Sequence, residues 1–503
     1  MGDIRARLLK GALWVALGRL LASSLGLIST LVLARLLMPE DFGLVAISAA
    51  FMAVVTSITE MPVSEALVQH DDPKDDHFHT AFSISVTRGV IMAVLLAMSS
   101  GAVAQFYDDE RLRDILYVMA IGVFAVSLTN PRLVMFQREL IFHQVFIMQI
   151  SEKLMGFIVA MTAALIFRSY WALVLGALAS EITRVLLSYI FCPIRPRLTF
   201  VYWRDLLSFS IWLTLGSSVQ ALNWRVVPLL YGAILPTNIM GQYSFGNRLT
   251  NTIFEQLAQP IQQTLYPAFS RFKTQKDALR MAYLRAQGVM CLWIIPCAIG
   301  FAAIAPTLVT QVVGEKWLQA VPVMQILAVT AALQASVAVQ PIAMATGNTQ
   351  RLFYRDIRAT LVRWPLILIG IWLGSPQGPY AMLIGSMLGA FVGAIVNVIW
   401  NMTLVRDVGD LRIRAQFQLL LRPALASMIM TSVIWLLETM LPPTNDAWGI
   451  WIRLLQLCVA GGLSYVITIA VLWRLAGRPK AAEADAIQMI GGGVRKLRDR
   501  IGA

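Results

Sequence analysis

The chain has 503 residues, of which 58% are hydrophobic and 14% are charged, and its mean hydropathy is +0.68. Soluble domains carry about 25% charged and about 45–50% apolar residues, so this composition excludes a soluble globular protein, a disordered chain and a fibrous chain. The formal net charge of +13 would suggest nucleic-acid binding in a soluble protein. In a membrane protein its meaning depends on where the charges lie.

Apolar runs of about 20 residues, long enough to cross a bilayer, recur along the whole chain. The eighth run is the most polar, and the connections are too short to hold a separate soluble domain. The sequence therefore predicts an all-α integral membrane protein with about 14 transmembrane helices. In chain order the predicted spans are 11–36, 42–66, 80–105, 114–131, 144–167, 169–192, 206–234, 239–268, 283–306, 320–346, 353–374, 378–402, 417–440 and 448–473.

The basic residues predict the orientation of these spans. With the N-terminus in the cytoplasm, 28 of the 41 Lys and Arg residues fall in cytoplasmic loops, 4 in periplasmic loops and 9 inside the spans. This asymmetry follows the positive-inside rule. We therefore expect a multi-pass protein with both termini in the cytoplasm, and most of the net charge reflects topology rather than nucleic-acid binding.

A short pattern repeats between the two halves of the chain. The motif W-x-x-L-G at Trp14 to Gly18 recurs at Trp212 to Gly216, an offset of 198 residues, and Leu36-Leu37-Met38-Pro39 matches Ala233-Ile234-Leu235-Pro236 at an offset of 197. The offset carries six spans, so both copies keep the same orientation. This predicts two parallel six-helix lobes of the kind that transporters rock to give alternating access. The expected parts are lobes at 1–200 and 201–405, two further helices within 406–476, and a basic cytoplasmic tail at 477–503.

Several segments resemble a known family of membrane transporters. They are LARLLMPEDFGLVAI (Leu33 to Ile47), Glu65 to Gln69, Tyr170 to Val174 and Leu265 to Arg271. These segments resemble Wzx-type polysaccharide flippases of the multidrug/oligosaccharidyl-lipid/polysaccharide exporter superfamily, in particular the exporters of exopolysaccharide and lipopolysaccharide repeat units. The resemblance implies a V-shaped helical fold, like that of the MATE transporters of the same superfamily.

The same resemblance implies a function. Such a protein moves an oligosaccharide linked to undecaprenyl diphosphate from the cytoplasmic to the periplasmic leaflet of a bacterial inner membrane, by alternating access. It implies polysaccharide polymerase or export machinery as partners and no nucleic acid. We expect no cofactor, no metal and no bond chemistry.

Nine basic residues lie inside the predicted spans, where a charge is costly. An arginine at the bilayer centre costs from about 2.5 to more than 10 kcal/mol unless it faces water or a partner. The guanidinium binds two phosphate oxygens at once and stays charged at working pH. We therefore expect Arg19, Arg88, Arg225 and Arg248 to line a cavity and bind the substrate diphosphate. The alternative is that each arginine pairs structurally with a carboxylate.

The eighth span carries a polar stripe. Arg248, Asn251, Glu255, Gln259 and Gln262 recur every three or four residues, which places them on one face of a helix. Such a face is not tolerated against lipid, so we expect it to line a hydrophilic cavity for sugar hydroxyls. The alternative is hydrogen bonding between helices within the lobe.

One further residue completes the expected cavity wall, and one residue of the stripe has a possible second role. Asn223 in the seventh span belongs to a weaker polar stripe that would face the same space. Glu255 is the candidate for coupling transport to a proton or sodium ion, unless it is a static partner of Arg248.

Two other functions remain open. A MATE-like exporter of small cationic molecules would share the fold, but an arginine-rich cavity repels such cargo. A membrane polysaccharide polymerase or glycosyltransferase would need a large periplasmic loop or a cytoplasmic catalytic domain. In the loop at 70–79, His70, His77 and His79 among aspartates predict a solvated acidic loop, with metal binding as the alternative.

Overall fold

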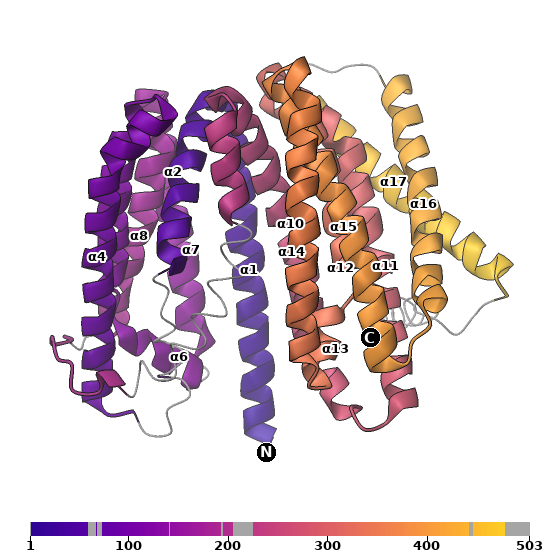
Figure 1. The fold of residues 1–503 in the computed structure, drawn as a ribbon, viewed down its shortest axis with the longest axis horizontal. Helices are drawn as coiled ribbons and strands as arrows, with labels where there is room; N and C mark the ends of the chain where they lie inside the picture. The colour runs from indigo at the N-terminus through magenta and orange to yellow at the C-terminus, as the bar shows by residue number, and fades with distance from the viewer. Residues whose placement is uncertain are drawn as a thin grey trace, which may run out of the picture. The chain divides into compact units, whose positions relative to one another are not determined.

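The structure is a computed structural model, and it describes residues 2–58, 67, 73–139, 141–192, 195–204, 225–441 and 446–477 (Figure 1). Regular structure in these residues is helical throughout. This confirms the prediction of an all-α membrane protein. The contacts divide the chain into two compact units, Met1–Phe245 and Gly246–Ala503.

The first unit is a bundle of long helices joined by tight turns (Figure 1). α7 packs against both α1 and α8, and α5 packs against α4, α8 and α2. Two of the turns place Asp108 and Arg168 in the left-handed region, where the chain reverses directly after α4 and α7. The helices of this unit are α1 (Gly2–Leu36), α2 (Pro39–Ile58), α4 (Asp75–Tyr107), α5 (Arg111–Ser127), α6 (Val134–Arg138), α7 (Phe142–Phe167), α8 (Trp171–Phe191) and a short apolar helix (Arg225–Ile234).

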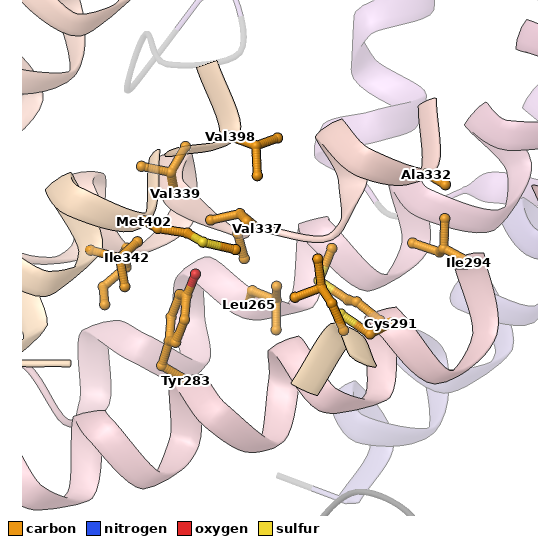
Figure 2. Close-up of a cluster of buried hydrophobic side chains, with 14 of the residues drawn as sticks. Leu265, Tyr283, Cys291, Ile294, Ala332, Val337, Val339, Ile342, Val398 and Met402 are labelled. Atoms are coloured by element: carbon orange, nitrogen blue, oxygen red, sulfur yellow. The ribbon is translucent and has the colours of Figure 1, made fainter. Parts of the chain in front are cut away.

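The second unit is built around α11, which packs against α12 and α16. Leu265, Tyr283 and Cys291 lie with residues of α12, α13 and α15 in a buried apolar cluster (Figure 2). α10 (Thr237–Arg271) begins in the first unit and continues into this one. The other helices are α11 (Lys276–Thr307), α12 (Ala320–Ala335), α13 (Val339–Ala345), α14 (Thr349–Gly374), α15 (Pro379–Gly409), α16 (Ile413–Met440) and α17 (Ala447–Leu475).

The predicted spans overlap helices wherever the chain is described, although α5 ends at Ser127 and the span at 320–346 is divided between α12 and α13 by residues 336–338. Eleven helical segments there are long and apolar enough to cross a membrane. α5 has 17 residues, and α10 carries the polar stripe, so neither is among the eleven. Most of the predicted span at 206–234 lies outside the described residues. The total of 14 spans therefore stays a prediction, as does the division into lobes.

A reciprocal glycine contact joins the beginnings of α2 and α10. A Cβ on Gly43 would lie 1.9 Å from the carbonyl oxygen of Thr237, and a Cβ on Gly241 would lie 1.7 Å from that of Pro39. Gly241 follows Gly43 by 198 residues, and Thr237 follows Pro39 by the same offset. The two helices therefore touch backbone to backbone, with the same spacing in sequence as the W-x-x-L-G repeat.

This contact predicts that alanine in place of Gly43 destabilises the protein, whereas alanine in place of Gly101 does not. Gly43→Ala places a methyl group inside the van der Waals radius of a backbone oxygen, so the helices must separate, at a cost of at least about 1–3 kcal/mol. We expect a lower Tm for the purified protein in detergent. Gly101→Ala on α4 is the matched control, because its Cβ meets nothing within 4 Å. Equal Tm values for the two variants would show that the helices do not touch here.

The segment 195–204 is bound to one face of α4 through its backbone. The N–H of Arg197 donates to Nδ1 of His79 at 3.1 Å, and the N–H of Thr199 donates to Oγ of Ser83 at 2.7 Å. The ring of His77 stacks on Tyr202 at 4.0 Å. His77 and His79 therefore hold the chain in place. No group of three metal-ligating side chains occurs among the described residues, and His70 lies outside them.

Removal of the His79 acceptor should release this segment locally. His79→Leu leaves the amide of Arg197 without its partner, while His79→Gln supplies an amide oxygen that accepts the same bond. One hydrogen bond is worth about 1 kcal/mol, so the leucine variant should speed hydrogen exchange in 195–204 by about fivefold. Hydrogen–deuterium exchange with mass spectrometry measures this. Exchange that is unchanged in the leucine variant would contradict the role of His79.

Candidate functional site

Two of the intramembrane arginines meet at the end of α2. Nη1 of Arg225 donates to the carbonyl oxygen of Ala53 at 2.7 Å, to Oγ of Ser57 at 2.5 Å and to Oγ1 of Thr56 at 3.3 Å. Nη2 of Arg88 on α4 donates to the carbonyl oxygen of Thr56 at 3.4 Å. Both guanidinium groups therefore contact the same turn of α2.

These bonds bring two cationic side chains to one part of α2. The oxygens that accept them are two backbone carbonyls and two hydroxyls at residues 53–57. A guanidinium carries five N–H donors in a planar fork, so it can bind several such oxygens at once. Both arginine side chains are half-buried, and these bonds hold them against α2.

Arg248 has different surroundings. Its side chain is exposed, and it makes no hydrogen bond or ion pair with any side chain in the described part of the second unit. It lies 11 residues after the first residue of α10, about 16 Å along the axis. An arginine inside a membrane helix needs water, an anion or another partner, and the described side chains of the second unit supply none to Arg248.

The described members of the stripe share this exposed face of α10. Asn251 and Gln262 are exposed, and Nδ2 of Asn251 donates to Oδ1 of Asn247 at 3.0 Å. The opposite face carries Phe254, which is buried, with Leu257 and Ile261 packed against the same apolar cluster. The polar face is therefore separate from the face that holds the unit together.

Arg19 lies in the first unit on α1. Its side chain is half-buried and has an interaction partner. Gly18 next to it lies against Phe146 of α7, whose ring is 4.9 Å from that of Trp14. The packing of α1 on α7 therefore positions Arg19. Three expected site residues cannot be placed, because Asn223 and the side chains of Glu255 and Gln259 lie outside the described residues.

A group of charges in the first unit was only partly anticipated from the sequence. Glu152 on α7 and Glu181 on α8 are half-buried, and each interacts electrostatically with Arg184. Neither carboxylate forms an ion pair within 4.0 Å in the described part of this unit. Glu181 and Arg184 are three residues apart in α8, a spacing that by itself predicts their interaction on one helix face. The approach of Glu152 depends on the packing of α7 against α8, which follows from Gly156 and Gly176 at their contact.

The two types of arginine predict different costs of substitution. Arg225→Gln removes hydrogen bonds from a charged donor to Ala53, Thr56 and Ser57 of α2, so we expect a loss of about 1–3 kcal/mol in stability. Arg248→Gln removes no interaction among the described residues, so its effect should stay within about 0.5 kcal/mol. Thermal unfolding of both variants in the same detergent measures this. Equal destabilisation would mean that Arg248 has a structural partner too.

The chain is similar in sequence to known proteins. A family described as polysaccharide biosynthesis protein matches residues 32–322. The "Lipopolysaccharide biosynthesis protein WzxC" of Escherichia coli (strain K12) is 24% identical over 406 residues, which cover 79% of this chain and 80% of that protein.

Two solved structures share the fold. "Lipid II flippase MurJ, inward closed conformation" aligns with a TM-score of 0.68 at 15% identity and covers 93% of this chain and 100% of its own. An inward-facing multidrug resistance MATE family transporter of the MOP superfamily aligns with a TM-score of 0.58 at 15% identity and covers 80% and 99%. These likenesses show that the helical transporter fold extends over most of the chain.

Proposed function

The chain belongs to the polysaccharide biosynthesis protein family, and from this premise we propose that it is a flippase for lipid-linked oligosaccharide repeat units. The resemblance to Wzx-type exporters is confirmed by the family match and the relatives. In our proposal the substrate is an oligosaccharide on undecaprenyl diphosphate. It crosses a bacterial inner membrane by alternating access, without any bond being made or broken.

The observation that carries the proposal is the exposed polar face of α10 with Arg248 on it. A lipid-linked oligosaccharide combines a diphosphate with neutral sugars. An arginine without a protein partner binds the first, and amide side chains bind hydroxyl groups. Arg248, Asn251 and Gln262 present these groups on one exposed helix face. We propose that Glu255, Gln259 and Asn223 extend the same binding surface.

We propose a ligand role for one of the other three arginines and a mainly positioning role for the other two. Arg19 is proposed as a ligand of the diphosphate, because it lies deep in its helix, as Arg248 does. Arg88 and Arg225 keep α2 in place, and their positive charge makes them further candidates for binding the diphosphate. Their hydrogen bonds to Ala53 and Thr56 make this a positioning role first.

The proposed function also includes an ion-coupling residue, an orientation in the membrane and partner proteins. Glu255 is the candidate for coupling to a proton or sodium ion. Both termini lie in the cytoplasm, as the distribution of basic residues indicates. Polysaccharide polymerase or export machinery would take the product in the periplasm.

The competing transport function is export of small cationic molecules, since a MATE transporter shares the fold. Charge separates the two proposals. Arg248 has no carboxylate partner among the described residues. An arginine of this kind repels a cation and attracts a diphosphate, which favours the anionic lipid.

Substitution of Arg248 tests the proposed function. We expect Arg248→Gln, in a strain that lacks the chromosomal copy, to lower polysaccharide output at least tenfold, and Arg248→Lys to restore part of it. Loss of one bidentate phosphate contact is sufficient for an effect of this size, since 1.4 kcal/mol is a factor of about ten. The lipid-linked intermediate should accumulate on the cytoplasmic leaflet.

Arg453→Gln on α17 is unsuitable as a control, because that side chain is buried. Arg406→Gln is suitable, because Arg406 is exposed and pairs only with its neighbour Asp407 among the described residues. It should leave output unchanged. Accumulation of no intermediate, or improved export of cationic compounds by Arg248→Glu, would refute the proposal.

A further inference from the structure

The beginning of α14 carries three arginines on one face. Arg351, Arg355 and Arg358 are spaced by four and three residues, so they lie within about 60° of one another around the helix axis. Arg351 and Arg358 are exposed, whereas Arg355 is half-buried. Asp356 is the only acidic residue in the sequence of α14. This face is therefore basic over about 10 Å of the helix.

Arg355 differs from the other two arginines because it is bound to neighbouring side chains. Its Nη1 donates to Oδ1 of Asn397 on α15 at 3.0 Å, and its Nη2 pairs with the carboxylate of Asp356 at 3.2 Å. Arg351 and Arg358 form no ion pair in the described part of the second unit. The carboxylate of α14 is therefore engaged by Arg355, and two positive charges are left uncompensated by the described side chains.

Exposed apolar side chains continue this face along α14, away from the arginines. Leu361, Ile369 and Trp372 are each at least 50% exposed, and they lie on the same side of the helix as the two exposed arginines. A different side of α14 packs closely on α15 (Figure 1), where a Cβ on Gly370 would lie 2.1 Å from the carbonyl oxygen of Gly385. An exposed apolar face on a membrane helix faces lipid. The basic face therefore begins a lipid-facing surface.

The length of α14 places the arginines at the membrane surface. Trp372, near the far end, has the position of an interfacial aromatic anchor. Arg351 precedes it by about 31 Å along the axis and Arg358 by about 21 Å. Because the hydrocarbon core is about 30 Å thick, Arg351 reaches the headgroups, and the long side chain of Arg358 extends towards them. Phe353 and Tyr354 are exposed at the same end, as interfacial aromatic residues are.

From this geometry we propose that the beginning of α14 binds the headgroup of an anionic phospholipid. In the orientation proposed above, this lipid belongs to the cytoplasmic leaflet. Arg351 and Arg358 bind its phosphate, because each guanidinium can bind two phosphate oxygens. The acyl chains lie along Leu361 and Ile369. Arg355 has a positioning role, since its bond to α15 keeps the basic face turned towards the lipid.

Charge selects this occupant. A zwitterionic headgroup carries its own cation, which two uncompensated arginines repel, whereas an anionic headgroup has a net charge opposite to theirs. The site lies on the lipid-facing side of α14 and is separate from the polar face of α10. The inference is therefore independent of the proposed function.

Lipid binding to the full-length protein tests this site. Native mass spectrometry of the protein in detergent measures the affinity for phosphatidylglycerol and for phosphatidylcholine with the same acyl chains. One test variant combines Arg351→Gln with Arg358→Gln, and a second replaces both residues by lysine. The matched control combines Arg412→Gln with Arg414→Gln, which removes two exposed arginines at the beginning of α16 and changes the net charge equally.

The variants should separate specific binding from net charge. A basic residue near an anionic lipid surface contributes about a fivefold factor, so the double glutamine variant should bind phosphatidylglycerol about 30-fold more weakly. Its affinity for phosphatidylcholine should not change, and its Tm should stay the same, because both side chains are exposed. The double lysine variant should keep most of the affinity, since it retains both charges. The control on α16 should bind both lipids as the unsubstituted protein does.

Three results would overturn the proposal. The first is phosphatidylglycerol binding that is unchanged in the double glutamine variant. The second is an equal loss in the control on α16, which would show a general effect of net charge. The third is weaker binding of undecaprenyl diphosphate with unchanged binding of phosphatidylglycerol, which would assign the arginines to the transported lipid. The proposed function survives each of them, because it rests on Arg248.

Discussion

The constraint on which this structure depends is the cost of a polar or charged group inside hydrocarbon. An arginine at that depth must reach water, an anion or backbone oxygen. The protein satisfies this requirement in two ways. Arg88 and Arg225 donate to carbonyl and hydroxyl oxygens of α2 at residues 53–57. Arg248 remains exposed on α10 without a partner among the described side chains. The first arrangement supports the fold, and the second is the one on which the proposed binding of an anionic ligand rests.

The same constraint explains how α10 divides its surface. Phe254 carries one face of the helix into the apolar cluster, with Leu257 and Ile261 packed against the same cluster, and Leu265 of that cluster is seen in Figure 2. This packing holds the helix in the second unit. Among the described side chains of the stripe, Arg248, Asn251 and Gln262 are exposed. A helix with this division is too polar to be recognised as a membrane span by hydropathy. It nevertheless belongs to a chain in which eleven described helical segments are recognised as membrane spans. Its polarity is the property that a hydrophilic substrate requires.

In a transporter, parts of the protein move against each other. Such parts need close contacts in which few side chains interlock. The contact of α2 with α10 at Gly43 and Gly241 has this character, because the backbones touch where side chains are absent. Each partner in this contact is displaced from its counterpart by 198 residues, which is the offset of the W-x-x-L-G repeat.

The sequence by itself determined the fold class, most of the helices and the face of α10 that carries the stripe, because apolar run length and helical periodicity are local properties. It also singled out Arg88, Arg225 and Arg248, since a charge inside an apolar run stands out without any knowledge of its neighbours. Only the tertiary structure decided what these arginines contact. The end of α2 lies 30 residues from Arg88 in sequence and more than 160 from Arg225, so no local pattern could connect them. The approach of Glu152 to Arg184 likewise depends on how α7 packs on α8. Partners across helices are set by packing, which periodicity does not encode.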